Sequence, residues 1–313
     1  MYLGIVFLQI SIVVCTSNRS ASLRRLLRSL ETEVSPQSKN IEIVVVANGC
    51  EDDTAEVVNS FMEQLPLRLI VESLPGLSRA RNVALTDTNG EAILWLDDDT
   101  EITQGLIASY VEALEKHPDV TYFAGRISSG FEGAPPSWVR FVVKKYPSTY
   151  SLLNMGTGER ALNPNLNEFP FGANMLVRRD ALSGFRFNEG LGRNQNADNL
   201  VGGEETELFK KLSAEGHVGV WVPDANVVHW MPPNRQTFQY FSAYQFAAGI
   251  IGVRLLGQKT TPFFWLLLPR YILSILIGRA TFWPSLWVPA LTELQRERGR
   301  VAEAKAALTI VKG

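Results

Sequence analysis

Three consecutive acidic residues, Asp97, Asp98 and Asp99, follow the apolar run Ala92–Leu96. Adjacent carboxylates repel one another unless a positive group lies close to them. Mg²⁺ and Mn²⁺ are suitable partners, because both prefer oxygen ligands and often share them with substrate phosphates. In an extended segment Asp97 and Asp99 point to one side and Asp98 to the other, which predicts that Asp97 and Asp99 address one ligand. The alternative is a solvated acidic turn that caps the next helix.

A second acidic cluster, Glu204 and Glu205, follows Gly202-Gly203 at the start of a predicted helix. The helix dipole favours glutamates in a first turn, which is the structural interpretation. The catalytic interpretation is that one of them is a general base, with the glycines allowing the backbone to approach a substrate. His229 ends an apolar strand and is either a core residue or a third metal ligand beside the aspartates.

Basic and amide side chains at the start of another predicted helix form a third cluster, Arg79, Arg81 and Asn82. Side chains of these types can meet phosphate oxygens at a helix start. The alternative for either arginine is a solvated helix face. The cluster therefore indicates a phosphate contact without choosing between the two arginines.

The elements that position these clusters alternate between strands and helices. Buried apolar runs and helical apolar spacing predict strands at 11–16, 41–46, 67–71, 92–96, 171–177, 218–222 and 226–229, and helices at 22–30, 54–65, 77–85, 104–116 and 204–215. This alternation indicates a parallel sheet, whose ligands bind beyond the carboxyl ends of the strands. Polar segments lie at three such ends: Thr16–Arg19, Ala47–Asp53 and Asp97–Glu101.

Taken in order, these segments resemble the glycosyltransferase family 2 pattern. The resemblance covers about two-thirds of the chain, and its segments are Ser11–Arg19 (SIVVCTSNR), Glu42–Asp53 (EIVVVANGCEDD), Gly76–Asn82 (GLSRARN), Asp97–Asp99, Phe171–Asn174 (FGAN), Gly203–Glu205 and His229. Two positions depart from the family pattern. Ala47-Asn48 stands where the family's base-binding loop usually carries aspartate, and Glu204-Glu205 stands in place of the common Glu-Asp pair.

The resemblance implies a GT-A fold, a mostly parallel sheet flanked by helices, and transfer of a sugar from a nucleotide-diphosphate donor to an acceptor hydroxyl with inversion. It implies that Glu205 is the catalytic base and that Asp97, Asp99 and His229 hold Mn²⁺ or Mg²⁺. The residues implied for the nucleotide-sugar site are Thr16, Asn18, Arg19, Asn48, Arg79, Arg81, Asn82, Asp97, Asp98, Gly172, Asn174 and Glu204. The expected acceptor is a glycan or glycolipid of the cell surface.

We expect a catalytic domain over residues 1–235 and an apolar helical segment over 236–313. Residues 236–292 are aromatic and poor in charge but interrupted by prolines, which favours peripheral membrane contact over a spanning helix. The alternative is packing on the catalytic domain or on a second subunit in a homodimer. Residues 293–308 are predicted to form a solvated helix. The apolar lead-in Met1–Gln9 extends the first strand, with a membrane anchor as the alternative.

Composition excludes several classes of protein. A net charge of −2 argues against a non-specific nucleic-acid binder, and two cysteines exclude a disulfide scaffold. We expect a cytoplasmic protein associated with the cytoplasmic face of the membrane. The alternatives to a glycosyltransferase are a non-catalytic nucleotide-sugar-binding or scaffold protein and, less favoured, a nucleotidyltransferase. The last needs a basic, glycine-rich loop after the first strand, whereas 16–20 has only Arg19 and no glycine.

Overall fold

The computed structural model describes residues 9–193 and 200–312, with side chains as far as 308. The chain forms two compact units. Unit 1 comprises residues up to 130, 153–190 and 204–230, and unit 2 comprises 131–152, 191–203 and the residues from 231 onward. Of the predicted lead-in Met1–Gln9, all but Gln9 lies outside the described residues. The predicted domain boundary at residue 235 stays a prediction.

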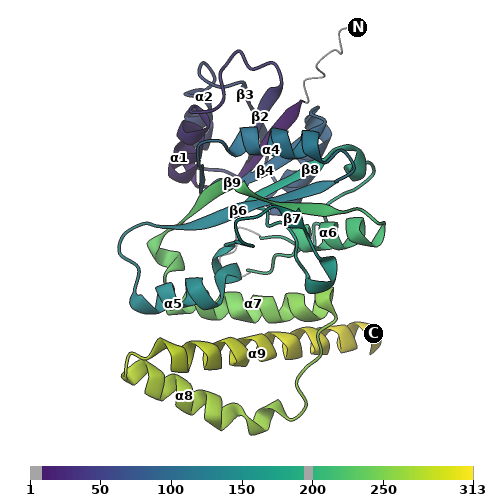
Figure 1. Ribbon diagram of the computed structural model, residues 1–313. Helices are drawn as coiled ribbons and strands as arrows, with labels where there is room; N and C mark the ends of the chain where they lie inside the picture. The colour runs from purple at the N-terminus through teal and green to yellow at the C-terminus, as the bar shows by residue number, and fades with distance from the viewer. Residues whose placement is uncertain (1–8, 194–199, 313) are drawn as a thin grey trace. The chain divides into compact units, whose positions relative to one another are not determined.

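Four parallel strands form one half of the sheet in unit 1, in the order β3-β2-β1-β4 (Figure 1). They are β1 (Ile10–Thr16), β2 (Ile41–Asn48), β3 (Leu67–Glu72) and β4 (Ala92–Asp97). The connecting helices are α1 (Ser20–Leu30), α2 (Thr54–Asn59) and α3 (Leu77–Asp87). β1 and β4 are buried along nearly their whole length, as continuous apolar runs predict.

The other half of the sheet is antiparallel, so the predicted mostly parallel sheet is corrected to a mixed one. Its strands are β5 (Thr100–Ile102), β6 (Tyr122–Phe131), β7 (Arg160–Ala161), β8 (Asn174–Arg178) and β9 (Gly219–Met231). The sheet continues from β4 through β8, β6 and β9 to β5, and β7 pairs with β9. β8 enters beside β4 in the opposite direction, and antiparallel neighbours do not need the crossover helix that parallel neighbours require.

Four predicted elements of unit 1 differ in extent from the observed ones. The strand predicted at 171–177 is β8, which begins only at Asn174, after a turn at Gly172-Ala173. α2 ends at Asn59 rather than near residue 65, because the chain continues in turns. The two strands predicted at 218–222 and 226–229 are one strand, β9, which runs through Pro223. α4 (Leu106–Lys116) and α6 (Glu204–Ala214) lie close to their predicted ranges. Large aromatic side chains fill the core: Trp95, Tyr122, Phe187, Phe209 and Trp221.

Unit 2 is helical. It contains α5 (Ser137–Lys145), α7 (Phe238–Leu256), α8 (Leu268–Ala280) and α9 (Pro284–Lys312), and α9 packs along α7 and α8 (Figure 1). Residues 128–168 hold α5 and β7 together with short 3₁₀ turns. None of the helices in the described ranges combines the length and apolarity needed to cross a lipid bilayer.

The predicted solvated helix at 293–308 is helical but only partly solvated. Gln295 and Glu297 are buried, and Glu297 accepts hydrogen bonds from the backbone and hydroxyl of Thr261. The close packing of α9 on α7 explains the difference, since two glycines let the backbones approach. A Cβ on Gly249 would lie 2.0 Å from the carbonyl oxygen of Arg296, and one on Gly299 would lie 2.0 Å from that of Phe246.

Gly299→Ala is therefore expected to destabilise unit 2. Alanine is normally favoured over glycine inside a helix by about 1 kcal/mol. Here the added methyl group meets backbone that cannot rotate away, and overpacking of this kind costs about 1 to 3 kcal/mol. Urea unfolding measures the effect. Gly158→Ala is the control, because its Cβ meets no atom within 4 Å; equal stability of Gly299→Ala and the wild type would contradict the expectation.

Candidate active site at the carboxyl ends of the parallel strands

The register of the parallel strands brings the three polar segments to one edge of the sheet. Thr16 pairs with Ala47 across β1 and β2, and Cys15 pairs with Asp97 across β1 and β4. The chain therefore leaves all three strands at the same edge. In open α/β sheets this is the edge where ligands bind.

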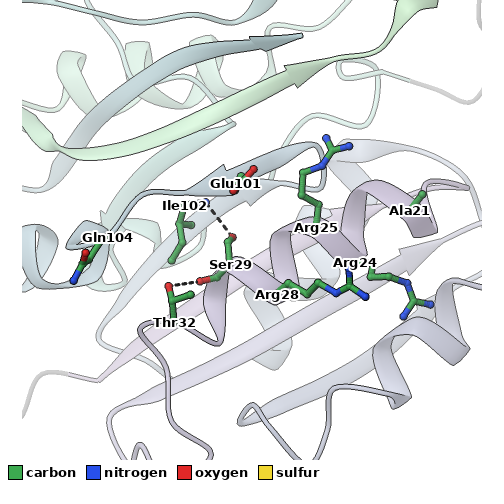
Figure 2. A pocket seen from close by; sticks show the side chains of 9 residues that line it. All are labelled: Ala21, Arg24, Arg25, Arg28, Ser29, Thr32, Glu101, Ile102 and Gln104. Atoms are coloured by element: carbon green, nitrogen blue, oxygen red, sulfur yellow. Dashed lines mark hydrogen bonds between the residues drawn. The ribbon is translucent and has the colours of Figure 1, made fainter. Parts of the chain in front are cut away.

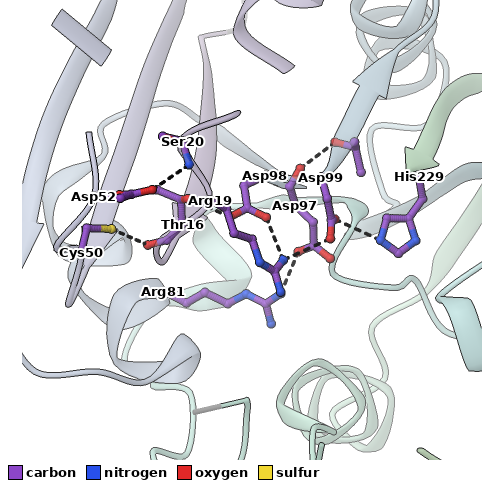
Figure 3. A network of polar contacts seen from close by, with 11 residues as sticks. Thr16, Arg19, Ser20, Cys50, Asp52, Arg81, Asp97, Asp98, Asp99 and His229 are labelled. Atoms are coloured by element: carbon purple, nitrogen blue, oxygen red, sulfur yellow. Dashed lines mark hydrogen bonds and ion pairs between the residues drawn. The ribbon is translucent and has the colours of Figure 1, made fainter. Parts of the chain in front are cut away.

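Arg19 joins two members of the acidic triplet (Figure 3). Its Nη1 donates to Asp98 Oδ1 and to Asp99 Oδ2, both at 3.1 Å, and Thr16 Oγ1 donates to Asp98 Oδ2 at 2.7 Å. The Asp98 carboxylate raises the pKa of Arg19, and burial raises the pKa of Asp98 itself. The predicted alternation of side chains is wrong for Asp98. β4 ends at Asp97, and Asp98-Asp99 form a turn that lets both carboxylates reach Arg19.

His229 lies against the third aspartate. It pairs with Thr100 across β9 and β5, and its Nε2 is 3.0 Å from Asp99 Oδ1. Two ligands at right angles around an octahedral ion, each about 2.1 Å from it, are about 3.0 Å apart, so this pair suits a shared ion. Carboxylate and imidazole groups are also of a chemical type that can bind Mn²⁺. No three histidine, cysteine, aspartate or glutamate side chains gather as a metal site within the described residues, so Asp97 is not grouped with this pair.

Arg81 connects the acidic triplet to the second acidic cluster. Its buried guanidinium donates to Glu204 Oε1 at 2.7 Å and lies 4.0 Å from both Glu205 Oε2 and Asp97 Oδ1. Gly172 leaves room for it, since a Cβ there would be 2.2 Å from Arg81 Nη2. One arginine thus holds the end of β4 and the start of α6 around the same space.

Glu205 lies in an environment that favours its protonated form. Burial and then the neighbouring Glu204 carboxylate raise the pKa of Glu205 to about 8, while Arg81 acts in the opposite direction. A general base works best when its pKa is close to the operating pH. A carboxylate in this environment can accept a proton near neutral pH, which ordinary glutamates do poorly.

Glu204→Gln is expected to shift the pH dependence of a reaction that uses Glu205 as base to lower pH. Glutamine still accepts a hydrogen bond from Arg81 but removes the negative charge that raises the pKa of Glu205. The rising limb of kcat/KM against pH, expected near pH 8 in the wild type, therefore moves down. Glu207→Gln in the same helical turn is the control. A rising limb that stays in place, or moves up, in Glu204→Gln would show that Glu205 does not set it.

Five other predicted site residues lie in contacts that hold the fold. Asn18 accepts from the backbone of Glu51, and Asn48 accepts from Gly76 and donates to Leu74 in the loop before α3. Asn82 exchanges two hydrogen bonds with the backbone of Phe187, and Asn174 donates across the sheet to Arg126 and Ala225. Arg79 pairs with Glu189. The structure thus gives these side chains bonding partners outside the acidic triplet, and their contacts with a donor stay predictions.

A family model described as Glycosyl transferase family 2 matches residues 11–185, more than half of the chain. The chain belongs to this family. The succinoglycan biosynthesis protein ExoM of Rhizobium meliloti (strain 1021) is 26% identical over 256 residues, which cover 80% of this chain and 76% of ExoM. This glycosyltransferase is therefore an enzyme, and neither a nucleotidyltransferase nor a non-catalytic scaffold is supported.

Solved structures of two glycosyltransferases have a similar fold. Mannosyltransferase PcManGT from Pyrobaculum calidifontis, in complex with GDP-Man and Mn²⁺, aligns with a TM-score of 0.58 at 17% identity, over 96% of this chain and 75% of PcManGT. Residues 1–349 of TarS from S. aureus align with a TM-score of 0.53 at 18% identity, over 78% of this chain and 65% of that one. The glycosyltransferase thus spans less than two-thirds of the TarS fragment. These likenesses confirm the predicted GT-A fold.

Two contacts in the glycosyltransferase site were absent from the sequence prediction. Asp52 accepts from the backbone of Ser20 at 3.0 Å, which ties the loop after β2 to the first turn of α1. The Phe187 ring lies 5.5 Å from the Arg81 guanidinium and, together with Gly172, confines it. The position of Asp52, an acidic residue in the loop after β2, could have suggested its contact with Ser20 from the sequence. Nothing in the sequence around Phe187 indicated its position.

A hollow of about 750 Å³ lies elsewhere in unit 1 of the glycosyltransferase. Figure 2 shows it between α1, which contributes Arg24, Arg25 and Arg28, and the β5 region, which contributes Glu101. Glu101 also accepts from Trp230 Nε1 at 2.8 Å. None of the predicted site residues lines this hollow, so it is distinct from the edge of the sheet where the acidic triplet lies.

Proposed function

We propose that this glycosyltransferase moves a sugar from a nucleotide-diphosphate donor to an acceptor hydroxyl with inversion of the anomeric carbon. The observation that carries the proposal is the position of Arg81, which holds Asp97 and the Glu204-Glu205 pair around one space. A donor diphosphate at the strand ends and a base at the start of α6 would then meet across that space. A single displacement assisted by one base inverts the anomeric configuration.

In this proposal Glu205 removes the proton of the acceptor hydroxyl as the hydroxyl attacks. Its raised pKa supports the role, because the carboxylate is then basic enough to hold that proton. Arg19 is exposed beside the triplet, which supports a contact between its guanidinium and the donor phosphates. Asp99 and His229 would hold Mn²⁺ or Mg²⁺. When bound, such an ion offsets the charge that grows on the leaving diphosphate.

The relatives support a donor and a biological role of this kind. The PcManGT structure contains GDP-Man and Mn²⁺, and a TarS structure that aligns over 92% of this chain with a TM-score of 0.55 contains UDP. ExoM is named for succinoglycan biosynthesis. We therefore propose a cell-surface glycan or glycolipid acceptor, with the enzyme acting at the cytoplasmic face of the membrane.

Release of free nucleotide from a panel of UDP- and GDP-sugars tests the donor assignment. The purified chain, with Mn²⁺ or Mg²⁺, is expected to release nucleotide diphosphate from one donor and to release more when a suitable acceptor is added. The anomeric configuration of the product, read by NMR coupling constants, tests inversion. A product with the donor's configuration, or no release from any donor with either ion, would overturn the proposal.

A further inference from the structure

Unit 2 carries a concentrated surface of exposed apolar side chains. Of the sixteen large apolar residues that are exposed in the described part of the chain, ten lie between Phe263 and Trp283. They are Phe263, Trp265, Leu266, Leu267, Ile272, Leu273, Leu276, Ile277, Phe282 and Trp283, here called the exposed apolar surface. Soluble proteins seldom expose so many neighbouring apolar groups unless the surface binds something.

The packing of α8 explains why this surface faces outward. A Cβ on Gly278 would lie 2.9 Å from the backbone nitrogen and Cβ of Trp287 in α9, so the Gly278 side of α8 lies against α9. Leu273 and Leu276 lie on the exposed side, and Leu276 is 63% exposed. Aromatic side chains stand at both ends of the helix, with Phe282 88% exposed. The helix is thus fixed by one side and leaves a continuous apolar stripe on the other.

The charged residues within this stretch of the sequence are all positive. Between Gln258 and Thr292 the sequence has Lys259, Arg270 and Arg279 and no acidic residue. Exposed tryptophan and arginine at the border of an apolar helix face are typical of segments that lie in the headgroup region of a membrane. A two-fold contact with a second copy would bring the same basic surface onto itself, with no carboxylate from this stretch to pair with it.

We propose that the exposed apolar surface docks onto an anionic lipid bilayer, with α8 lying in the plane of the headgroups. α8 has 13 residues and is about 20 Å long, too short to span the hydrocarbon core. Its apolar stripe enters the boundary between headgroups and acyl chains, and the exposed Arg270 meets lipid phosphates. The inference goes beyond the proposed transfer reaction and does not depend on it, since docking requires neither donor nor metal ion.

Vesicle flotation of the full chain, without donor or metal, tests the proposal. The wild type is expected to float with vesicles of phosphatidylcholine and phosphatidylglycerol in equal parts, and to float less with phosphatidylcholine alone. The double variant Leu273→Glu with Leu276→Glu is expected to bind at least about tenfold more weakly. Arg270→Gln is expected to reduce the preference for phosphatidylglycerol while leaving binding to phosphatidylcholine unchanged.

Leu166→Glu is the matched control, because Leu166 is 67% exposed and lies in unit 1. It is expected to float like the wild type. Thermal unfolding shows whether the double variant folds, and donor cleavage is measured on the same samples, so that loss of docking and loss of catalysis are told apart. Wild-type protein that floats with neither vesicle would overturn the proposal. So would a wild-type dimer that becomes monomeric in the double variant while flotation stays unchanged.

Discussion

Replacing Glu205 with glutamine is expected to lower kcat by about a hundredfold or more. Glutamine has the shape of glutamate and can still lie beside Arg81, but it cannot take the proton of an acceptor hydroxyl. General-base assistance of this kind contributes about a hundredfold to ten-thousandfold to enzymatic rates. KM for the donor is expected to change little, because Glu205 faces the acceptor in the proposed arrangement.

The same substitution is expected to stabilise the fold near pH 8. Well below pH 4.5 the Glu205 carboxyl holds its proton in both the folded and the unfolded chain, so its contribution to stability does not change with pH. As the pH rises toward 8, the unfolded chain loses this proton while the folded chain keeps it, and the wild type is progressively destabilised. Glutamine does not titrate, so the variant keeps a stability that the wild type loses.

The gain at pH 8 is on the order of a few kcal/mol, which corresponds to several degrees in Tm. It should vanish well below pH 4.5, where neither state of the wild type has lost the proton. Glu207→Gln is the matched control, since both side chains are 21% exposed and lie in the same turn. A catalytic rate of Glu205→Gln close to that of the wild type would show that Glu205 is not the base. A Tm difference between the two proteins that does not depend on pH would show that the pKa of Glu205 is not raised.

The sequence predicted the part of the fold that local pattern determines. β1, β2 and β4 are continuous runs of apolar residues, and such runs require burial on both faces, which parallel strands provide. The meeting of the polar segments at one edge then follows from strand direction alone. The antiparallel half of the sheet was harder to predict from the sequence. β6 ends in a mixed polar segment, and β5 has only three residues, too few to show any periodicity.

The roles of single side chains were harder to predict, because their partners are distant in the sequence. Asn82 bonds to Phe187, 105 residues away, and Asn174 bonds to Ala225, 51 residues away. Arg79 and Arg81 have the same chemistry two positions apart on α3. Only the packed structure shows that Arg81 is buried against Glu204 while Arg79 turns outward to Glu189. The sequence could therefore locate the cluster but could not assign its members.

Asp99→Asn is expected to lower turnover by about a hundredfold or more and to abolish the response to divalent ions. Asp99 is buried between Arg19 and His229, where its two oxygens lie 3.1 Å and 3.0 Å from their nitrogens. Asparagine keeps the volume but loses the charge that draws both a cation and the arginine. In the wild type, EDTA is expected to stop donor cleavage reversibly, and Mn²⁺ or Mg²⁺ is expected to restore it.

Thermal unfolding separates this loss of ion binding from loss of fold. Mn²⁺ with a nucleoside diphosphate is expected to raise the Tm of the wild type, because a ligand that binds only the folded state stabilises it, and to leave the Tm of Asp99→Asn unchanged. Glu101→Gln is the control: it removes a charge two residues along, but its side chain bonds to Trp230 rather than to Arg19 or His229. If Asp99→Asn and Glu101→Gln lose activity equally, or if EDTA leaves the wild type fully active, Asp99 is not an ion ligand. The pair Asp99–His229 is then an ordinary buried contact.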